Sequence, residues 1–475
     1  MLTGLLFAAF AWRHPLTMKE DPEIQKAMDA AISAIPAAES DPERPAYHFH
    51  APANWMNDPN GPIYYQGWYH LFYQFNPFGD QWGHMHWGHA RSRDLVHWQH
   101  LPIAVGPTHD REDHIFSGSS FLSDTGVPTI IYTSISNKRE PEQWAALPSD
   151  DDLLTWHKSP GDPVISQANH GATPIAEWRD PFMFKLEGKT HLITGGGLKG
   201  RGIVAIYEAE NAELTKWRYE GVLFEHPDAD VPNIECPNIG RFGGKWVLLV
   251  SVHGRVESFV GTLDPKTLKF ETERRGVLND GSYASQLALD VKGRYVHYAW
   301  VNTNNHKGWN GWMTLPSVLA LTKDGQIVRQ PVSDFAKLRK THHTMKNAGL
   351  QAGLDLTDKT EGDLWELIAD IDPGSSTRIS IKIGASEISY DPSTRTLQAP
   401  GRPPLHLPGT GNLKLHVFLD RVSLDLYAAD GLLTTSSQID PDNKGLEISS
   451  SGAATAKSID LYTIGPLNFD KTMFR

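Results

Sequence analysis

The sequence has only one cysteine, Cys236, among 475 residues. The chain therefore cannot form an internal disulfide, and a lone thiol is compatible with both reducing and oxidising compartments. Stability must come from a packed core instead, and a hydrophobic content of 40% is high enough to form a large one.

The sequence also lacks any segment rich in lysine or arginine. Its 44 basic residues are outnumbered by 56 acidic ones, which gives a formal net charge of −12. A chain of this charge is repelled by a phosphate backbone, so we expect no nucleic-acid partner.

Long hydrophobic runs are missing as well. The apolar run near the N-terminus, Leu5 to Trp12, is far shorter than the roughly 20 residues that span a bilayer, so we expect no membrane association. No lysine or arginine precedes it, as a typical signal peptide requires, although Ala8, Ala9 and Ala11 would suit a cleavage site. The sequence therefore favours a cytoplasmic location, with secretion as the alternative, and it predicts no particular oligomeric state.

Residues 1–44 are predicted to form an N-terminal arm that contains a short helix. Ile24, Met28, Ile32 and Ile35 follow one another at intervals of 4, 4 and 3 residues, which places them on one face of a helix. This face is expected to dock on the main body of the protein, and a mobile arm is the alternative.

Aromatic and turn-forming residues are abundant. The sequence contains 15 Trp, 14 Tyr and 18 Phe together with 41 Gly and 32 Pro. This composition is typical of an all-β protein built from short strands and tight turns. Aromatic rings also pack against the C–H faces of sugars, which favours a small carbohydrate as the partner.

A short motif recurs through the first part of the chain. An acidic or polar residue is followed by Leu, two further residues and an aromatic one, at Trp98, Trp156, Trp217 and, more weakly, Phe270. The steps between these aromatic residues are 58, 61 and 53. A period near 58 holds four strands with their turns, which is typical of a β-propeller blade. Five such blades need about 290 residues and fit residues 45–339.

A second series of polar residues keeps nearly the same interval. Asp58, Ser117, Asp180, Glu235 and Asp280 are separated by 59, 63, 55 and 45 residues, and each lies close to a Gly or Pro. If every blade contributes its equivalent innermost strand, these residues converge at one end of the propeller axis. The sequence therefore predicts an acidic pocket assembled from five distant segments.

The pattern changes after Arg339. Residues 340–354 are polar and irregular and are predicted to form a linker. Residues 355–475 contain runs of alternating polarity, such as 364–369 and 378–383, separated by turn-forming residues, which favours a β-sandwich. The predicted fold class is therefore all-β, with a five-bladed β-propeller followed by a C-terminal β-sandwich.

Six ordered motifs carry a family resemblance: Asn54–Pro62, Phe72–Pro77, Met85–Ala90, Phe116–Ser119, Trp178–Pro181 and Glu235–Pro237. Together they resemble glycoside hydrolase family 32, the family of invertases, levanases and inulinases. The resemblance extends from about Tyr47 to the C-terminus, with weaker matches at Gly308–Pro316 and Phe418–Asp425. It implies a five-bladed propeller with a C-terminal sandwich, which agrees with the spacing.

The sequence departs from the family pattern beside the last of these motifs. Ile234 and Asn238 stand where the family commonly has Trp and Asp, and Leu315–Val318 stands where it commonly has Leu-Pro-Arg-Glu. These changes flank the expected site and leave its carboxylates in place.

The resemblance implies retaining hydrolysis of terminal β-D-fructofuranosyl residues, with sucrose as the expected substrate. Asp58 matches the family's nucleophile, Glu235 its acid/base, and Asp180 the carboxylate that stabilises the transition state. Ile234 and Cys236 are expected to desolvate Glu235 and so favour its protonated form. Eight further residues are implied to bind substrate: Asn57, Gln74, Trp82, Phe116, Ser117, Arg179, Tyr283 and Trp309.

Several alternatives stay open. An exo-fructanase acting on inulin or levan, or a fructosyltransferase, would use the same residues for the first chemical step. A non-catalytic, carbohydrate-binding propeller is the alternative from another class, and its expected mark is the loss of a carboxylate. Taken singly, Asp58 is also compatible with a turn and Asp180 with an ion pair.

His84, His86 and His89 have spacings that also occur in metal sites. On a strand, His84 and His86 share a face and His89 does not, so the three are poorly placed to bind one ion. We therefore interpret them as structural or substrate-contacting residues and expect neither a metal nor a cofactor.

Overall fold

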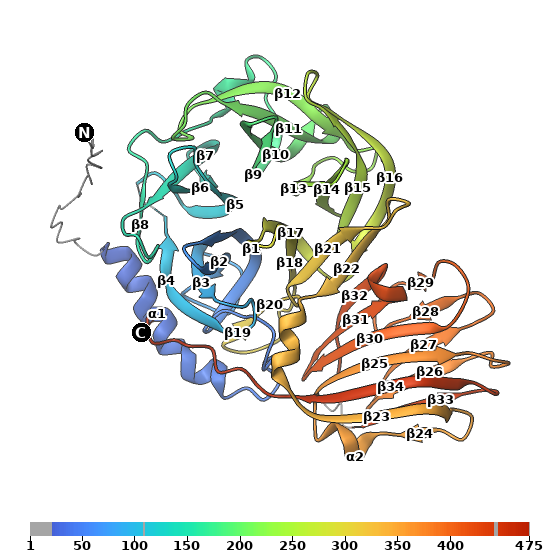
Figure 1. The fold of residues 1–475 in the computed structure, drawn as a ribbon. Helices are drawn as coiled ribbons and strands as arrows, with labels where there is room; N and C mark the ends of the chain where they lie inside the picture. The colour runs from blue at the N-terminus through green and yellow to red at the C-terminus, as the bar shows by residue number, and fades with distance from the viewer. Residues whose placement is uncertain (1–20, 108–109, 441–444, 475) are drawn as a thin grey trace, which may run out of the picture.

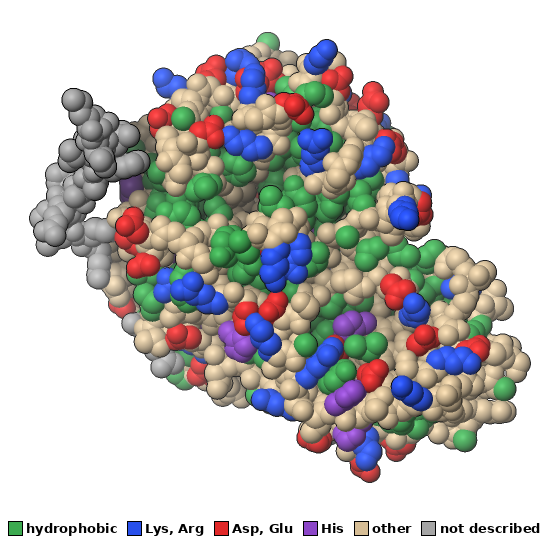
Figure 2. Space-filling view, viewed as in Figure 1, with side chains coloured by type: hydrophobic (Ala, Val, Ile, Leu, Met, Phe, Trp, Pro, Cys, Tyr) green, Lys and Arg blue, Asp and Glu red, His purple; other side chains and the backbone are tan. Residues whose placement is uncertain are grey.

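The computed structural model describes residues 21–107, 110–440 and 445–474, so the apolar run at residues 5–12 lies outside the described part. Five sheets surround a common axis as the blades of a propeller, and two six-stranded sheets form a sandwich beside it (Figure 1). This is the predicted fold class. On the face drawn in Figure 2, acidic and basic side chains are interspersed over both domains.

The blades follow one another along the chain, and each is built from neighbouring antiparallel strands. Blade 1 contains β1 (Asn54–Tyr65), β2 (Trp68–Asn76), β3 (His86–Ser92), β4 (Trp98–Val105) and the parallel β19 (Trp309–Asn310). Blade 2 contains β5 (His114–Leu122), β6 (Pro128–Ser136), β7 (Arg139–Pro148) and β8 (Trp156–Lys158). Blade 3 contains β9 (Ala176–Leu186), β10 (Lys189–Leu198), β11 (Arg201–Ala209) and β12 (Trp217–Glu225). Blade 4 contains β13 (Glu235–Phe242), β14 (Lys245–Val252), β15 (Arg255–Asp264) and β16 (Lys269–Asn279). Blade 5 contains β17 (Tyr283–Leu289), β18 (Tyr295–Val301), β20 (Trp312–Met313), β21 (Ser317–Leu321) and β22 (Ile327–Pro331).

The recurring Leu-x-x-aromatic motif forms the turn into the outermost strand of a blade. Its leucine adopts a left-handed backbone conformation in all four copies, with φ of 67°, 57°, 60° and 54°. In the three copies with tryptophan, the indole N–H donates to the carbonyl of that leucine at 2.9–3.2 Å. A left-handed leucine is strained, and in the three copies with tryptophan the buried leucine and the tryptophan bond together stabilise the turn. The four leucines are Leu95, Leu153, Leu214 and Leu268.

Helix α1 (Pro22–Glu39) covers the predicted N-terminal helix. It begins at Asp21, whose carboxylate accepts the backbone N–H of Glu23 at 3.0 Å, an N-cap that satisfies one free donor of the first turn. Met28 and Ile35 are buried against the propeller, while Ile24 and Ile32 are partly buried. The helix is therefore docked as predicted. No helix in the described ranges is long and apolar enough to cross a membrane.

The sandwich begins earlier than predicted. Residues 339–349 form β23 (Arg339–Gly349), which pairs with β34 (Thr455–Ile464), so the predicted linker at 340–354 is wrong over most of its length. Alternate side chains of β23 are exposed, which explains its irregular polar appearance. The first sheet has the order β23, β34, β25 (Leu364–Asp372), β30 (Leu413–Asp420), β31 (Ser423–Ala428), β32 (Leu433–Gln438). The second has the order β24 (Leu354–Asp355), β33 (Leu446–Ser450), β26 (Ile379–Ile383), β27 (Ser386–Asp391), β28 (Thr396–Gln398), β29 (Leu405–His406). The remaining short helices are η1 (Gln167–His170), η2 (Ser333–Leu338), α2 (Thr357–Thr360) and η3 (Ala429–Gly431).

The last described residues leave the sandwich and return to the propeller beside α1 (Figure 1). The carbonyl of Asp470 accepts the backbone N–H of His100 at 2.7 Å, and Phe469 and Phe474 are buried in the same core as α1 and blade 1. Lys471 also forms an ion pair with Glu39 of α1. The predicted sandwich at 355–475 therefore ends near residue 464, and the tail joins the two domains.

A buried ion pair also joins the domains. His48 precedes blade 1, and its ring nitrogens lie 2.8 Å from Asp420 and 3.0 Å from Asp425, both in the sandwich. Burial opposes the charge on the imidazole, but the hydrogen bonds that its two ring nitrogens donate to the carboxylates outweigh burial and raise the pKa of His48 to about 9. These two aspartates belong to the weakly matching stretch 418–425, which thus holds the propeller against the sandwich.

We expect His48→Gln to lower the free energy of unfolding by about 3 kcal/mol at neutral pH, because two buried carboxylates lose their cation. Since the pKa of His48 is raised from 6.5 to about 9, its contribution is complete below pH 6.5 and is lost as the pH rises through 9. Urea denaturation should therefore show a difference in unfolding free energy between the wild type and His48→Gln that shrinks at alkaline pH. His100→Gln is the matched control, since His100 is equally buried and its ring makes no hydrogen bond within the described residues. An equal difference at all pH values would contradict this role.

Candidate active site

The innermost strands of the five blades form a ring around the axis. β1, β5, β9, β13 and β17 each contact the next, and β17 contacts β1 (Figure 1). Each carries a β-bulge in which two of its residues face one residue of the neighbouring strand. Such bulges bend a strand and re-aim its side chains. The bulged pairs are Asn57 and Asp58, Phe116 and Ser117, Asp180 and Pro181, Cys236 and Pro237, and Ala284 and Ser285.

Three of the bulges place a residue other than glycine in the left-handed region. The φ values are 62° at Asp180, 46° at Cys236 and 52° at Ala284. Such conformations cost of order 1–3 kcal/mol each and persist where the surrounding structure enforces them, commonly at functional sites. The strain therefore coincides with the predicted site.

Asp58, in the bulge of β1, accepts hydrogen bonds from two side chains. The hydroxyl of Ser117 donates to Oδ2 at 2.6 Å, and the amide of Asn57 donates to Oδ1 at 3.0 Å. The indole of Trp55 in turn donates to Asn57 at 2.8 Å and fixes its orientation. Burial raises the pKa of Asp58, the two hydrogen bonds lower it, and the nearby Glu235 carboxylate raises it. The two hydrogen bonds therefore fix the orientation of the Asp58 carboxylate.

Asp180 is the most buried carboxylate of the three, at 4% exposure. It accepts the backbone N–H of Cys236 at 2.9 Å, and its own backbone N–H donates to Thr133 at 2.9 Å. Burial raises the pKa of Asp180 to about 7, and the carboxylates of Asp58 and Glu235 add to this, while Arg179 opposes it. The carboxylates of Asp58 and Glu235 therefore lie close enough to Asp180 to affect its ionisation.

Both carboxylate oxygens of Glu235 accept hydrogen bonds. The guanidinium of Arg179 donates to Oε1 at 2.6 Å, and the hydroxyl of Tyr283 donates to Oε2. Arg179 also lies 3.9 Å from Asp180 and 2.8 Å from Glu177, so it links two of the three carboxylates. The side chain of Glu235 is 31% exposed. The prediction that Ile234 and the following residues desolvate Glu235 is therefore wrong, because these polar contacts and solvent surround it instead.

Cys236 lies between the other two carboxylates. Its Sγ is 3.5 Å from Asp58 and 3.4 Å from Asp180. Burial and these acidic neighbours raise the pKa of the thiol well above its usual value, so the sulfur remains protonated and poorly nucleophilic. This agrees with its interpretation as an apolar neighbour.

Three predicted substrate-binding residues lie beside this group. Gln74 is the β2 residue opposite the bulge of β1, and its Nε2 is buried with no hydrogen-bond partner in the described part of the chain. Trp82 is 53% exposed, with its ring centroid 6.1 Å from that of Phe116. Gln74 therefore provides an unpaired amide opposite Asp58, and Trp82 and Phe116 form an aromatic pair that includes the residue before Ser117.

Two predictions are wrong. Trp309 is 2% exposed, its ring stacks on His306 and its indole donates to Asp41 at 2.8 Å, so it belongs to the core and cannot contact a substrate. Asp280, the fifth member of the acidic series, forms a bridge with Thr435 of the sandwich instead of joining the carboxylates. Blade 5 contributes Tyr283 in its place, three residues further on.

Several supporting residues were not predicted. Thr133 accepts the N–H of Asp180, and Asn238 binds the backbone of Ser285 at 2.7 Å and of Leu287 at 2.8 Å, so it joins β13 to β17. Trp300 is the β18 partner of Tyr283, and its buried Nε1 has no hydrogen-bond partner among the described residues. The sequence signal for these residues was Asn238, which stands where the family commonly has Asp. An asparagine on an inner strand can satisfy backbone groups of the neighbouring strand.

The raised pKa of Asp180 predicts a pH-dependent cost to stability. Its pKa is about 7 in the folded protein against an ordinary 3.8, so the folded state prefers the protonated form, and ionisation destabilises it increasingly between these values. We expect Asp180→Asn to raise the melting temperature at pH values above about 7 and to give no gain near pH 4, in calorimetric scans across this range. An equal gain at both pH values would contradict this assignment.

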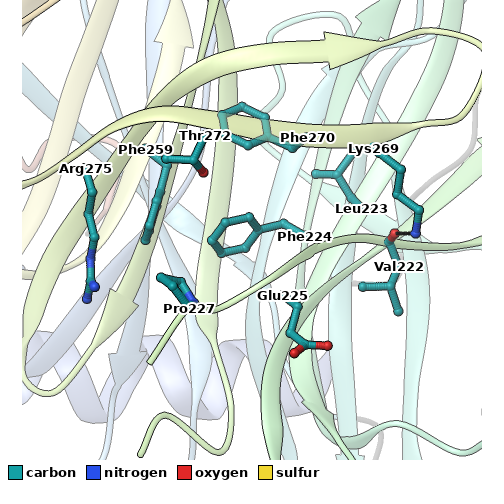
Figure 3. A pocket seen from close by; sticks show the side chains of 10 residues that line it. All are labelled: Val222, Leu223, Phe224, Glu225, Pro227, Phe259, Lys269, Phe270, Thr272 and Arg275. Carbon is teal, nitrogen blue, oxygen red and sulfur yellow. Dashed lines mark hydrogen bonds between the residues drawn. The ribbon is translucent and has the colours of Figure 1, made fainter. Parts of the chain in front are cut away.

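A cavity of about 610 Å³ lies elsewhere, between the outer strands β12 and β16 (Figure 3). Phe224, Phe259 and Phe270 line it, with Lys269 and Arg275 beside them. It contains none of the predicted site residues. The cavity is therefore separate from the three carboxylates.

Among the described residues, no three His, Cys, Asp or Glu side chains are grouped so that they could hold a metal ion. His84 and His86 contact Phe78, whereas His89 stacks on Phe72 and lies 3.0 Å from His70. His84 and His86 thus lie beside one ring, and His89 packs against other residues.

A propeller whose inner strands bring together Asp58, Asp180 and Glu235 has the paired carboxylates of a glycoside hydrolase. Residues 48–331 match the Glycosyl hydrolases family 32 N-terminal domain, and residues 334–463 match the Glycosyl hydrolases family 32 C terminal domain. The chain therefore belongs to glycosyl hydrolase family 32, and it is an enzyme that hydrolyses terminal fructosyl residues.

Three known proteins illustrate the range of its relatives. The chain is 31% identical to the levanase of Bacillus subtilis (strain 168) over 89% of this chain and 70% of that protein. It is 30% identical to the sucrose-6-phosphate hydrolase of Zymomonas mobilis over 93% of this chain and 96% of that protein. Its structure is similar to that of a mutant β-fructofuranosidase of Bombyx mori in complex with sucrose, with a TM-score of 0.77, 25% identity, and coverage of 95% and 99%.

Proposed function

We propose that this enzyme hydrolyses sucrose to glucose and fructose with retention at the fructosyl carbon, using Asp58 as nucleophile and Glu235 as acid/base. One observation supports this most: Asp58 is oriented by Ser117 and Asn57, while Glu235 is held by Arg179. Glycoside hydrolysis uses two carboxyl groups in different roles, and retention follows if Asp58 takes the nucleophile's role that the family resemblance gives it. The sucrose complex of the Bombyx mori relative favours this substrate.

In the first step, Asp58 attacks the anomeric carbon of the fructosyl unit while Glu235 protonates the departing glycosidic oxygen. The C–O bond breaks, glucose leaves, and a fructosyl ester forms on Asp58. In the second step, Glu235 takes a proton from water, whose oxygen attacks the same carbon and releases Asp58. The proton gained by Glu235 replaces the one it gave to glucose, so the enzyme is regenerated.

Asp180 and Arg179 are proposed to act on the same fructosyl unit without forming bonds to it. A buried carboxylate accepts hydrogen bonds from sugar hydroxyls, and these strengthen as the ring flattens toward the oxocarbenium-like transition state. Arg179 keeps Asp180 and Glu235 at a fixed separation. The unpaired amide of Gln74 offers a further donor to a hydroxyl.

Product analysis tests the substrate. Purified protein is incubated separately with sucrose, sucrose 6-phosphate, 1-kestose, inulin and levan, and glucose, fructose and oligomers are resolved by chromatography. We expect equal glucose and fructose from sucrose, with little release from the polymers. Fructose mainly from polymers would replace the proposal by an exo-fructanase, and excess glucose with new oligomers by a fructosyltransferase. Turnover of the phosphorylated sugar alone would make the substrate that of the Zymomonas mobilis relative.

A further inference from the structure

Strand β32 is unusual because it is polar, buried and at the edge of its sheet. Its four central residues, Thr434 to Ser437, are each at most 4% exposed. Backbone groups at a sheet edge lack partners within the sheet, so burial there requires partners from elsewhere. The propeller supplies them through Asp280: its carbonyl accepts the N–H of Ser436 at 2.9 Å, and its N–H donates to Thr434 at 3.4 Å.

Side chains reinforce this contact with residues 279–282, which we name the interdomain loop. The two hydrogens of the Asn279 amide go to Ser436 of the sandwich at 3.2 Å and to Ser282 of the loop at 2.7 Å. The amide oxygen of Asn279 accepts the hydroxyl of Thr434 at 3.0 Å. Every polar atom of this 0%-exposed side chain is therefore engaged, which fixes the loop to β32.

β32 is itself anchored on its other side. The hydroxyl of Ser436 donates to Asp425, the carboxylate that also binds His48 across the domain interface. Gly281 shows how closely the loop and strand approach, since a Cβ at this position would lie 2.0 Å from the Ser436 carbonyl and its φ is +86°. No other residue fits there without moving the strand or the loop.

The interdomain loop leads directly into the active site. Tyr283 is the next residue along the chain, and its hydroxyl donates to Glu235. Ala284 follows in a left-handed conformation, with its N–H bound to Ser251 at 3.0 Å. Tyr283 is thus held between two fixed points, the sandwich on one side and blade 4 on the other.

We propose that β32 is a positioning element for catalysis: Ser436, acting through Asn279 and Ser282, holds the loop that carries Tyr283 and so sets the position of the Glu235 carboxyl. The inference rests on the proposed role of Glu235 as acid/base. A displacement of about 1 Å at a proton-transferring group is enough to cost roughly 10²-fold in rate. The sandwich then contributes to turnover although none of its residues touches the fructosyl unit.

Ser436→Ala tests this, with Ser437→Ala as the matched control. Both serines are 1% exposed on the same strand, but the Ser437 hydroxyl has no hydrogen-bond partner within the described residues. We expect Ser436→Ala to lower kcat about 10-fold with KM nearly unchanged, and to shift the pH profile of kcat, while Ser437→Ala stays near the wild type. Ser282→Ala breaks the same link from the propeller side and serves if Ser436→Ala is poorly folded.

A double-mutant cycle separates positioning from a general loss of structure. If Ser436 acts through Tyr283, adding Ser436→Ala to Tyr283→Phe lowers kcat by less than about 2-fold further. A full 10-fold further loss, or an unchanged kcat in both Ser436→Ala and Ser282→Ala, would overturn the proposal. Crystal structures give a readout that needs no substrate: Tyr283 moves away from Glu235 in Ser436→Ala and not in Ser437→Ala. An unmoved Tyr283 also overturns the positioning role, whereas failure of the wild type to release fructose from sucrose would concern the proposed function alone.

Discussion

Asp58→Ala is expected to lower kcat for fructoside hydrolysis by roughly 10⁴-fold or more, because the covalent intermediate can no longer form. The fold should survive, since removing a buried carboxylate whose pKa is raised by burial relieves a desolvation cost. Steady-state kinetics and a thermal scan on the same preparation give both values. Hydrolysis by a residual water-based route accounts for any activity that remains.

Asp280→Asn is the matched control for this variant. Asp280 belongs to the same series in the sequence, but it contacts the sandwich through its backbone, and its carboxylate lies 3.8 Å from Arg402. We expect its kcat to stay within about 3-fold of the wild type. Near wild-type turnover by folded Asp58→Ala would show that the nucleophile lies elsewhere.

Glu235→Ala is expected to lower kcat on sucrose by about 10²- to 10⁴-fold, the usual contribution of a positioned acid/base. The loss should depend on the leaving group, because an activated aryl fructoside needs no protonation to depart. Azide should then attack the fructosyl ester and release the fructosyl unit as fructosyl azide, since an anionic nucleophile needs no general base. Kinetics on both substrates, with and without azide, measure these effects.

Glu177→Gln is the control for Glu235→Ala. Its carboxylate also binds Arg179, at 2.8 Å, but its side chain is 66% exposed. We expect little change in kcat and no response to azide. Equal losses on sucrose and on the aryl fructoside in Glu235→Ala would be inconsistent with an acid/base role.

The propeller could be predicted because its repeat has a local physical cause. A leucine in the left-handed conformation, with a tryptophan bonded to its carbonyl, makes the same turn in several blades and leaves the same residues in the sequence. The site follows this interval since the bulges of Asp58, Asp180 and Cys236 occupy equivalent places in their blades. Periodicity therefore predicted both the architecture and the convergence of the carboxylates.

Contacts between distant segments could not be predicted in the same way. Trp309 lies in a motif that resembles a family site, yet Asp41 and His306 hold it in the core. The environment of Glu235 depends on Arg179, whose side chain reaches across from another blade. Neighbours in sequence carry no information on such contacts, so the expected desolvation of Glu235 was wrong.

The prediction of the domain boundaries was wrong for a related reason. Residues 340–354 were predicted as a linker because they are polar and irregular, although the backbone of β23 pairs with β34 apart from an irregularity between Arg339 and His342. β32 has a polar composition that suits a surface strand, yet the propeller covers it. Alternation of polarity indicates a strand with one exposed face, and it does not report what covers that face.

The most direct test of the account is the configuration of the fructosyl product. Purified enzyme turns over sucrose in water containing methanol, and the methyl fructoside is identified by NMR. Because a fructosyl ester on Asp58 inverts the anomeric carbon twice, the account predicts methyl β-D-fructofuranoside and no α anomer. Formation of the α anomer would contradict a covalent intermediate on Asp58.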